Sequence, residues 1–393
     1  MIRQRLLLQE GRFHINGEFR HCDVRIDGST ITEIGEHLRP ANNEKVIPLN
    51  NLCVVPGLIN SHDHLEFNLF PRLGNPPYAN YVEWSKDIQE RCQSEIRQVL
   101  RIPLNYRLLW GAYKNIFSGV TTVVHHNVYY WRFRLAFPLE VYHPYRWIHS
   151  LRLEKRDLRK LLSTNGTICF IHLAEGFDTI ASQELTELKG MNGLTNKTIV
   201  VHGVGLTDED VETMRAVGCG LVWCPTSNDF LFHTTAPVEK MIGRIPIALG
   251  TDSTLTGSLT LFDELRAARK IKRLNGSDLL ALVTSSPSRM LGMKSREIGF
   301  GAQADFVMFE DHGANSFETF LGLSAKTICM VWRNGKAIFG DAPYLGRVAV
   351  TTGYISTFDM GERRKFVIGD FPKLVKRITT ILPDVDLSVI HPN

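Results

Sequence analysis

The sequence lacks the cysteine patterns of disulfide-rich proteins and of zinc-ribbon proteins. Its seven cysteines are scattered, odd in number and include no Cys-x-x-Cys pair. This usage is typical of buried thiols in a reducing compartment, and it argues against a disulfide framework or a thiolate zinc site. We therefore expect a cytoplasmic protein whose chemistry rests on other residue types.

Long apolar runs and a strong net charge are also missing. No run approaches the length of a membrane span, and the apolar patch at residues 6–8 is too short for a signal peptide. The net charge is only +4, and the basic clusters at 152–156 and 266–273 are interrupted by acidic or apolar residues, as on solvated helix faces. We expect a small-molecule substrate and neither a nucleic-acid nor a membrane partner. The oligomeric state stays open, a homodimer included.

What is present indicates an α/β protein. A chain of 393 residues can hold one large barrel plus a smaller module. Residues 57–295 alternate short β-branched runs, such as Val120–Val124, with segments of helical period, such as 207–216. This alternation predicts parallel strands, and about 240 residues is the size of a (β/α)8 TIM-like barrel.

The two ends of the chain have a different texture. Residues 1–56 and 296–350 contain short strands with glycine and asparagine turns, which predicts a small composite β-sandwich built from both ends. Residues 351–393 follow as a C-terminal extension of unknown role, with a helix expected around 372–382.

The stretch GLINSHDHLE at residues 57–66 places two histidines one residue apart at the end of an apolar run. In an extended strand, His62 and His64 project to one face and Asp63 turns away. Taken alone, the pair is either half of a metal site or two polar residues at a strand end.

Three further strands end in residues that can bind metal or carry protons. One ends in His172 with Glu175 three residues later, and the next two end in His202 and Asp252. The separations of 110, 30 and 50 residues from His62 onward fit strands 1, 5, 6 and 8 of a barrel, whose carboxyl ends meet in one ring. Three histidines and a carboxylate suit a divalent ion that activates water, and one histidine and one glutamate remain for proton handling.

Across about residues 12–340 the chain resembles the amidohydrolase superfamily, in its mononuclear branch of aminohydrolases that includes cytosine, guanine and S-adenosylhomocysteine deaminases and chlorotriazine hydrolases. A single His-x-His is weak, but the ordered set is specific. The motifs are VVPGLINSHDHL, GVTTVV, FIHLAEG, VHGVGL, CPTSN, LGTDS, SSPSRMLGM and GAQADFVMF.

The resemblance implies a role for each strand-end residue. Glu175 shuttles protons, His202 hydrogen-bonds the activated water or the substrate, and Asp252 takes part in proton transfer. Binuclear relatives use a carbamylated lysine after strand 4, whereas the nearest lysines here, Lys155 and Lys160, lie in a helix-like charged segment. One ion, Zn²⁺ or Fe²⁺, is therefore expected. Its implied ligands are His62, His64, His172 and Asp252.

The residues that contact the substrate are harder to predict. Candidates are His126, His149, Trp84 and Asn228, each with packing or loop shaping as the alternative. Only 49 residues separate Val123 from His172, so three βα units receive about 16 residues each, near the shortest workable crossover. We expect stunted helices or an irregular wall between 128 and 166, and the origin of specificity in that region.

The predicted reaction is hydrolytic deamination of a nitrogen heterocycle by metal-activated water. One alternative is hydrolysis of another bond at the same site, either an amide or cyclic-amide C–N bond or a C–Cl bond. A second alternative is a non-catalytic binding protein on the same scaffold.

Overall fold

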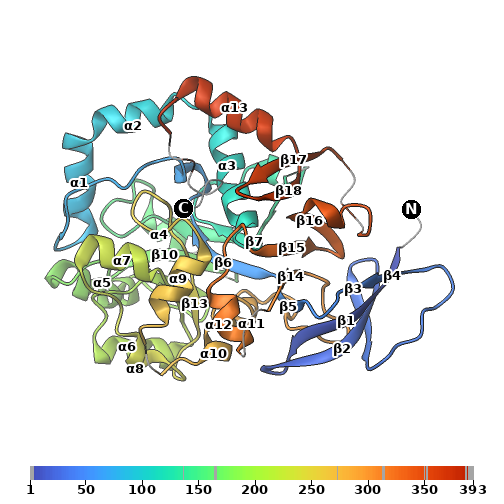
Figure 1. Ribbon diagram of the computed structural model, residues 1–393. Helices are drawn as coiled ribbons and strands as arrows, with labels where there is room; N and C mark the ends of the chain where they lie inside the picture. Colours follow the sequence, from blue (N-terminus) through green and yellow to red (C-terminus); the bar gives the residue numbers. More distant parts are fainter. Residues whose placement is uncertain are drawn as a thin grey trace.

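The computed structural model describes residues 4–135, 137–162, 166–271, 273–311, 315–348, 350, 353–385 and 387, and Figure 1 shows their arrangement. Eight strand segments within these residues form the parallel barrel wall. In chain order they are β6 (Leu58–Asp63), β7 (Val120–His125), β8 (Glu140–Val141), β9 (Arg146–Ile148), β10 (Cys169–Leu173), β11 (Thr198–His202), β12 (Gly220–Trp223) and β13 (Ile247–Leu249).

The strands pair in the order expected for a TIM-like barrel. One ladder runs β6-β7-β8 and a second runs β13-β12-β11-β10-β9, with parallel pairing throughout. A parallel bridge between Asp63 and Asp252 joins the end of β6 to the chain just after β13. This order confirms the predicted barrel and brings the first and last strands side by side.

The wall is irregular between β7 and β10, as the residue spacing predicts. The four residues from Tyr142 to Tyr145, all described, join β8 to β9 without a helix. Because a parallel crossover needs about ten or more residues, β8 and β9 act as two parts of one bent segment that pairs first with β7 and then with β10. The neighbouring helices are short: η2 (Trp131–Arg134) and α4 (Leu158–Leu162).

Each strand from β10 to β13 is followed by helices. They are α5 (Thr179–Gly190), α6 (Asp208–Val217), α7 (Pro225–Phe232), α8 (Val238–Met241), α9 (Leu261–Ala268), α10 (Gly276–Ala281) and α11 (Ser285–Met290). The local sequence explains α6. Thr207 and Asp210 form a capping box at its start, and Gly218 ends it in a left-handed conformation with φ +85°.

The chain between β6 and β7 is long. It forms η1 (Leu65–Phe67), α1 (Tyr81–Arg91), α2 (Gln93–Leu100) and α3 (Leu104–Phe117). In Figure 1, α1 and α2 lie at the outer edge of the molecule, whereas α3 packs between the barrel and the red C-terminal elements.

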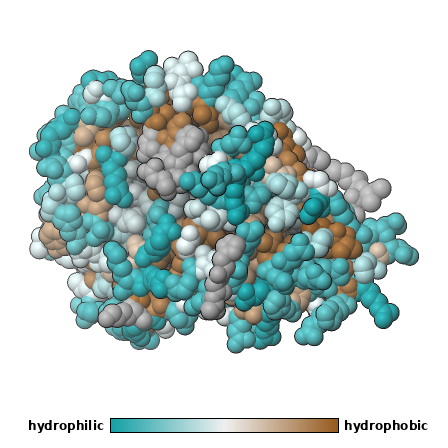
Figure 2. Space-filling view, in the orientation of Figure 1, coloured by the Kyte–Doolittle hydropathy of each residue, from teal (hydrophilic) through white to brown (hydrophobic). Residues whose placement is uncertain are grey.

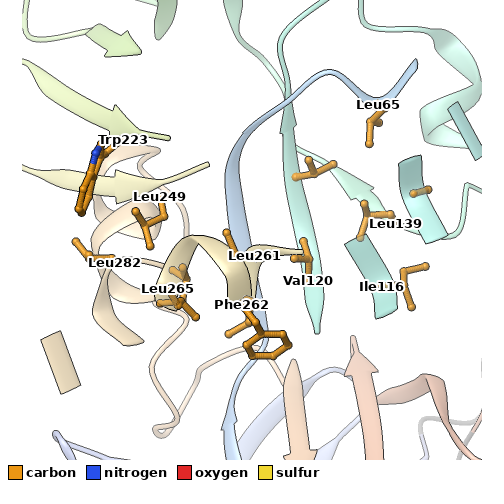
Figure 3. Close-up of a cluster of buried hydrophobic side chains, with 14 of the residues drawn as sticks. Leu65, Ile116, Val120, Leu139, Trp223, Leu249, Leu261, Phe262, Leu265 and Leu282 are labelled. Atoms are coloured by element: carbon orange, nitrogen blue, oxygen red, sulfur yellow. The ribbon is translucent and has the colours of Figure 1, made fainter. Parts of the chain in front are cut away.

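Apolar side chains from strands and helices form the barrel's outer core (Figure 3). Trp223 and Leu249 of the strands face Leu265 of α9, while Val120 of β7 lies near Ile116 of α3. All five of these side chains are buried. This packing fixes the strand ends that carry the polar site.

Strands from both ends of the chain form one ten-stranded sheet, ordered β17-β18-β16-β15-β14-β5-β1-β2-β3 with β4 beside β1. The strands are β1 (Arg5–Ile15), β2 (Glu18–Asp27), β3 (Thr30–Gly35), β4 (Glu44–Pro48), β5 (Cys53–Pro56), β14 (Phe306–Phe309), β15 (Ile328–Arg333), β16 (Lys336–Asp341), β17 (Ile355–Met360) and β18 (Arg363–Ile368). The remaining short elements are α12 (Ser316–Leu321) and η3 (Ala342–Tyr344). The division into a separate β-sandwich, a barrel and an extension stays a prediction.

The described part of the C-terminal extension joins both regions. Its strand β18 pairs with β16, and β17 pairs with β18 at the edge of the sheet. The predicted helix is present as α13 (Phe371–Ile381), and Phe371 stacks against Trp110 of α3 and meets Tyr113 and Phe117 edge-on. This segment therefore covers α3, as Figure 1 shows.

The visible surface is mostly hydrophilic, with hydrophobic residues in separate patches (Figure 2). Among the helices of the described residues, none has the length and apolar character needed to cross a membrane.

Candidate active site

Backbone hydrogen bonds hold the two ends of the barrel ladder together at the predicted site. The Asp252 N–H donates to the His62 carbonyl at 3.1 Å, and the His64 N–H donates to the Asp252 carbonyl at 3.1 Å. These bonds place His62, His64 and Asp252 side by side although 188 residues separate the last two.

Three imidazoles and one carboxylate converge at this point. Asp252 Oδ1 lies 3.5 Å from His62 Nε2 and 3.4 Å from His64 Nε2, and His172 Nε2 lies 3.2 Å from His62 Nε2. All four residues are buried. The structure thus brings together the four residues that the sequence predicts as metal ligands.

The candidate ligand atoms form two overlapping groups, each within 4.8 Å: His62, His64 and Asp252, and His62, His172 and His202. Their shortest separations match the edges of a tetrahedral metal site. Ligand atoms at zinc-like bond lengths of about 2.0–2.1 Å stand roughly 3.3 Å apart along the edges of a tetrahedron. The separations here are 3.2, 3.4 and 3.5 Å. Burial holds the pKa values of His64 and His172 well below the usual range, so these rings are neutral and offer lone pairs.

The second oxygen of Asp252 is held by hydroxyl groups. Ser227 Oγ donates to Oδ2 at 2.9 Å and Thr256 Oγ1 donates to it at 2.6 Å. Burial alone would raise the pKa of Asp252, but the neighbouring imidazoles hold it well below its usual range. Asp252 is therefore an ionised carboxylate near neutral pH.

Glu175 and His202 form a second pair beside this centre. His202 Nε2 lies 3.6 Å from Glu175 Oε1. Burial, with the nearby charge of Asp252, raises the pKa of Glu175 well above its usual range. Burial lowers the pKa of His202 to about 4. The pair is a protonated carboxyl group next to a neutral imidazole.

Asn228 fixes the orientation of His202. Its Nδ2 donates to Thr235 Oγ1 at 3.2 Å, so its Oδ1 faces His202 Nδ1 at 3.0 Å and accepts a hydrogen bond from it. Nδ1 then carries the ring hydrogen, and Nε2 faces Glu175 with its lone pair. Asn228 is fully buried and contacts His202 through its side chain. Its predicted contact with the substrate stays a prediction.

The backbone is strained at three non-glycine residues of the site. Ala174, His202 and Asp252 have φ values of +53°, +72° and +57°. Such left-handed conformations cost free energy for residues with a Cβ and cluster at functional sites. The local sequence does not predict them.

A match to the amidohydrolase family model covers residues 148–338, which include His172, His202 and Asp252. Over this region the chain is similar to the amidohydrolase family. Its relatives include the 5-methylthioadenosine/S-adenosylhomocysteine deaminase of Caldanaerobacter subterraneus subsp. tengcongensis, which is 26% identical over 73% of this chain and 80% of the relative. The 5'-deoxyadenosine deaminase of Methanothrix thermoacetophila is 23% identical over 68% of this chain and 75% of the relative.

Solved structures share the fold of this chain. The adenosine deaminase from Xanthomonas campestris with bound zinc has a TM-score of 0.74 at 16% identity and covers 96% of this chain and 97% of its own. The zinc complex of atrazine chlorohydrolase from Arthrobacter aurescens has a TM-score of 0.70 at 16% identity, covering 96% of this chain and 100% of its own.

The remaining predicted contact residues differ in their relation to the candidate site. His126 is buried and stacks on His172 with ring centroids 4.2 Å apart, and its Nε2 pairs with the Ile148 carbonyl. His149 is exposed but presents its ring edge-on to His172 at 5.3 Å. Trp84 lies on α1 and donates its ring N–H to the Leu73 carbonyl.

A buried polar network beneath the site was not predicted. Asp63, turned away from the two histidines as expected, receives hydrogen bonds from Asn60, Asn68, Asn115 and Thr251. The ammonium group of Lys114 on α3 lies 3.4 Å from Asp63 Oδ2 and donates to Asn68 and Thr251. The available signal was two further polar residues, Asn60 and Asp63, in the strand that carries His62. Their partners come from distant segments.

Proposed function

We propose that this protein is a metal-dependent aminohydrolase that removes an amino group from a nitrogen heterocycle. The observation that carries the proposal is the convergence of three imidazoles and the ionised Asp252 next to a protonated Glu175. Hydrolytic deamination needs a centre that makes water nucleophilic and a group that delivers a proton to the departing amine.

The metal-binding residues in this proposal are His62, His64, His172 and Asp252, which would hold one divalent ion. Zn²⁺ and Fe²⁺ both suit an imidazole and carboxylate set without thiolates. When bound, such an ion is a Lewis acid that makes water a nucleophile near neutral pH. The bound zinc in the two neighbouring structures supports this choice.

The proton steps follow from the protonation states. Asp252 is ionised, so it takes a proton from the attacking water. Glu175 is protonated, so it donates to the ring nitrogen or the departing amine. His202 is neutral with its Nδ1–H held by Asn228, which leaves Nε2 directed at Glu175.

We propose 6-aminopurine nucleosides as the substrate class. The names of relatives that act on 5-methylthioadenosine, S-adenosylhomocysteine and 5'-deoxyadenosine support this class. His126, His149 and Trp84 are the proposed substrate contacts, since imidazole and indole rings pack well on a flat heterocycle.

Ammonia release from the metal-loaded protein tests the proposal. The panel contains adenosine, 5'-deoxyadenosine, 5-methylthioadenosine, S-adenosylhomocysteine, guanine and cytosine, with chloride release from a chlorotriazine measured in parallel. We expect ammonia from at least one adenine nucleoside and bound Zn²⁺ or Fe²⁺ by elemental analysis. A protein that takes up neither metal, or releases chloride but no ammonia, contradicts the proposal.

A further inference from the structure

A buried glutamate on α5 links the Glu175 loop to the start of α1. Glu184 has no exposed surface, and its two carboxylate oxygens accept hydrogen bonds from different segments. Oε2 accepts from the backbone N–H of Ala174 at 2.8 Å, and Oε1 accepts from the hydroxyl of Tyr81 at 2.6 Å. In the proton steps above, neither Glu184 nor Tyr81 has a role.

The hydrogen bond to Ala174 acts on the residue that aims Glu175. Ala174 lies between the strand that ends in Leu173 and Glu175 itself, with φ +53°. Its N–H is held by Glu184, and its carbonyl accepts from the Gly205 N–H at 2.8 Å. The left-handed turn is thus fixed on both sides, and the direction of the Glu175 side chain depends on it.

The first residues of α1 lie across the same loop. The Tyr81 N–H donates to the Glu175 carbonyl at 3.0 Å, and the Phe177 N–H donates to the Ala79 carbonyl at 3.0 Å. Gly176 permits this approach, because a Cβ there would stand 2.5 Å from the Ala79 oxygen. Asn80 Nδ2 also donates to Asp178 at 2.7 Å.

The rest of α1 and α2 is held more weakly. Within these two helices, all of whose residues are described, the buried side chains are those of Tyr81, Ile88 and Val99. Figure 1 shows both helices at the outer edge of the molecule. Their attachment to the active-site loop therefore depends strongly on the contacts of residues 79–81.

We propose that Glu184 is a positioning residue that couples the docking of α1 to the placement of Glu175. When Tyr81 is docked, its hydroxyl and the Ala174 N–H share one buried carboxylate, and the Glu175 carbonyl is held by the Tyr81 N–H. When α1 moves away, Glu184 loses the hydrogen bond from the Tyr81 hydroxyl, and the Glu175 carbonyl loses the hydrogen bond from the Tyr81 N–H. This inference rests on the proposed role of Glu175 in proton transfer.

The variant Tyr81→Phe tests the coupling with the loss of one hydroxyl group, and Tyr113→Phe is the matched control. Tyr113 of α3 is also a buried tyrosine, and its hydroxyl donates to the carbonyl of Ile368 at the end of β18. We expect kcat of Tyr81→Phe to fall about 10- to 100-fold, the cost of a misplaced catalytic group. Tyr113→Phe keeps the kcat of the natural protein.

A double-variant cycle separates positioning from general damage. In a protein that already carries Glu175→Gln, we expect Tyr81→Phe to change kcat by less than about twofold, because the Glu175 carboxyl group that Tyr81 helps to position is already absent. We expect Glu184→Leu to lower kcat as much as Tyr81→Phe does. Glu184→Gln is expected to lose less kcat than Glu184→Leu, because its amide can accept a hydrogen bond from the Ala174 N–H and donate one to the Tyr81 hydroxyl. Equal losses in both backgrounds overturn the proposal.

Amide hydrogen exchange gives a readout that does not need activity. We expect faster exchange in peptides covering 173–177 and 79–83 in Tyr81→Phe and Glu184→Leu, and unchanged exchange there in Tyr113→Phe. Unchanged exchange in all variants, or faster exchange without loss of kcat, overturns the coupling. If the natural protein deaminates nothing in the panel, the proposed function fails, whereas the exchange result still decides whether the link exists.

Discussion

The barrel wall has a regular side, β10 to β13, and an irregular side, β7 to β9, which differ in the length of the segments that connect their strands. From β10 to β13, each strand is buried throughout and is followed by at least one helix. From β7 to β9, the described chain contains only the short η2 between strands, and β9 has two partly exposed residues. His172, His202 and Asp252 stand on the regular side, whereas His126 and His149 stand on the irregular side.

This difference separates two requirements of an enzyme site. Groups that hold a metal ion or transfer protons need positions accurate to a fraction of an ångström, which well-packed strands and helices supply. Groups that shape the substrate pocket tolerate variation, and loops commonly carry them. We therefore expect changes on the regular side to act on kcat and metal content, and changes on the irregular side to act on KM.

The largest expected effect is that of Asp252→Asn on the regular side. The change removes the ionised carboxylate that faces His62 and His64, and we expect kcat/KM to fall about 10³-fold or more. Ammonia release and metal content are the measurements. The control Asp359→Asn alters an exposed residue of β17 and leaves both unchanged. If Asp252→Asn keeps more than about a tenth of the kcat/KM of the natural protein, the proposed role of Asp252 in proton transfer is contradicted.

The next effect concerns the network where the first strand meets the last. Lys114→Met removes a buried ammonium group and leaves Asp63 without its counter-charge, so we expect the free energy of unfolding to drop by about 3–5 kcal/mol. Urea unfolding measures the loss. The control Lys376→Met removes an exposed charge from α13 and costs less than about 0.5 kcal/mol. Equal stability of the two variants contradicts a supporting role for the network.

A third prediction concerns a buried glutamate that joins α9 to α7. Burial raises the pKa of Glu264 from 4.5 to about 7, with hydrogen bonds from Ser258 and Thr226 limiting the rise. The folded state therefore binds the proton more tightly than the unfolded chain. The stability contributed by the protonated group is complete below about pH 4.5 and is lost as the pH rises to about 7.

The neutral variant Glu264→Gln removes this dependence. Relative to the natural protein, it gains about 3 kcal/mol in the free energy of unfolding between pH 4.5 and pH 8. Urea unfolding at the two pH values measures the gain. A constant difference between the two proteins contradicts the raised pKa.

The sequence predicts the regular side better than the irregular side, for a physical reason. His172 and His202 follow short apolar runs, and parallel strand ends meet in one ring, so spacing alone brings them together. The 49 residues between Val123 and His172 reveal a shortage of chain, but they do not reveal that β8 and β9 lack a helix between them.

Residues that act through tertiary contacts escape sequence reasoning. Lys114 and Glu184 lie in helices whose local patterns resemble ordinary amphipathic segments, and their partners are 51 and 103 residues away. Only the packing of α3 and α5 on the barrel shows that both side chains are buried. Such positions are recognised only in the folded structure. Because burying a charged group without a partner costs free energy, each of these side chains has a polar partner there.

The smallest effect tests the irregular side. His149 presents its ring edge to His172 from the end of β9, and His149→Ala removes one proposed contact with the substrate. We expect KM to rise about 3- to 10-fold, the value of one weak polar contact, with kcat unchanged within about twofold. Metal content stays equal to that of the natural protein. A fall in kcat or metal content instead of a rise in KM would place His149 with the groups of the metal centre and break the division between the two sides of the wall.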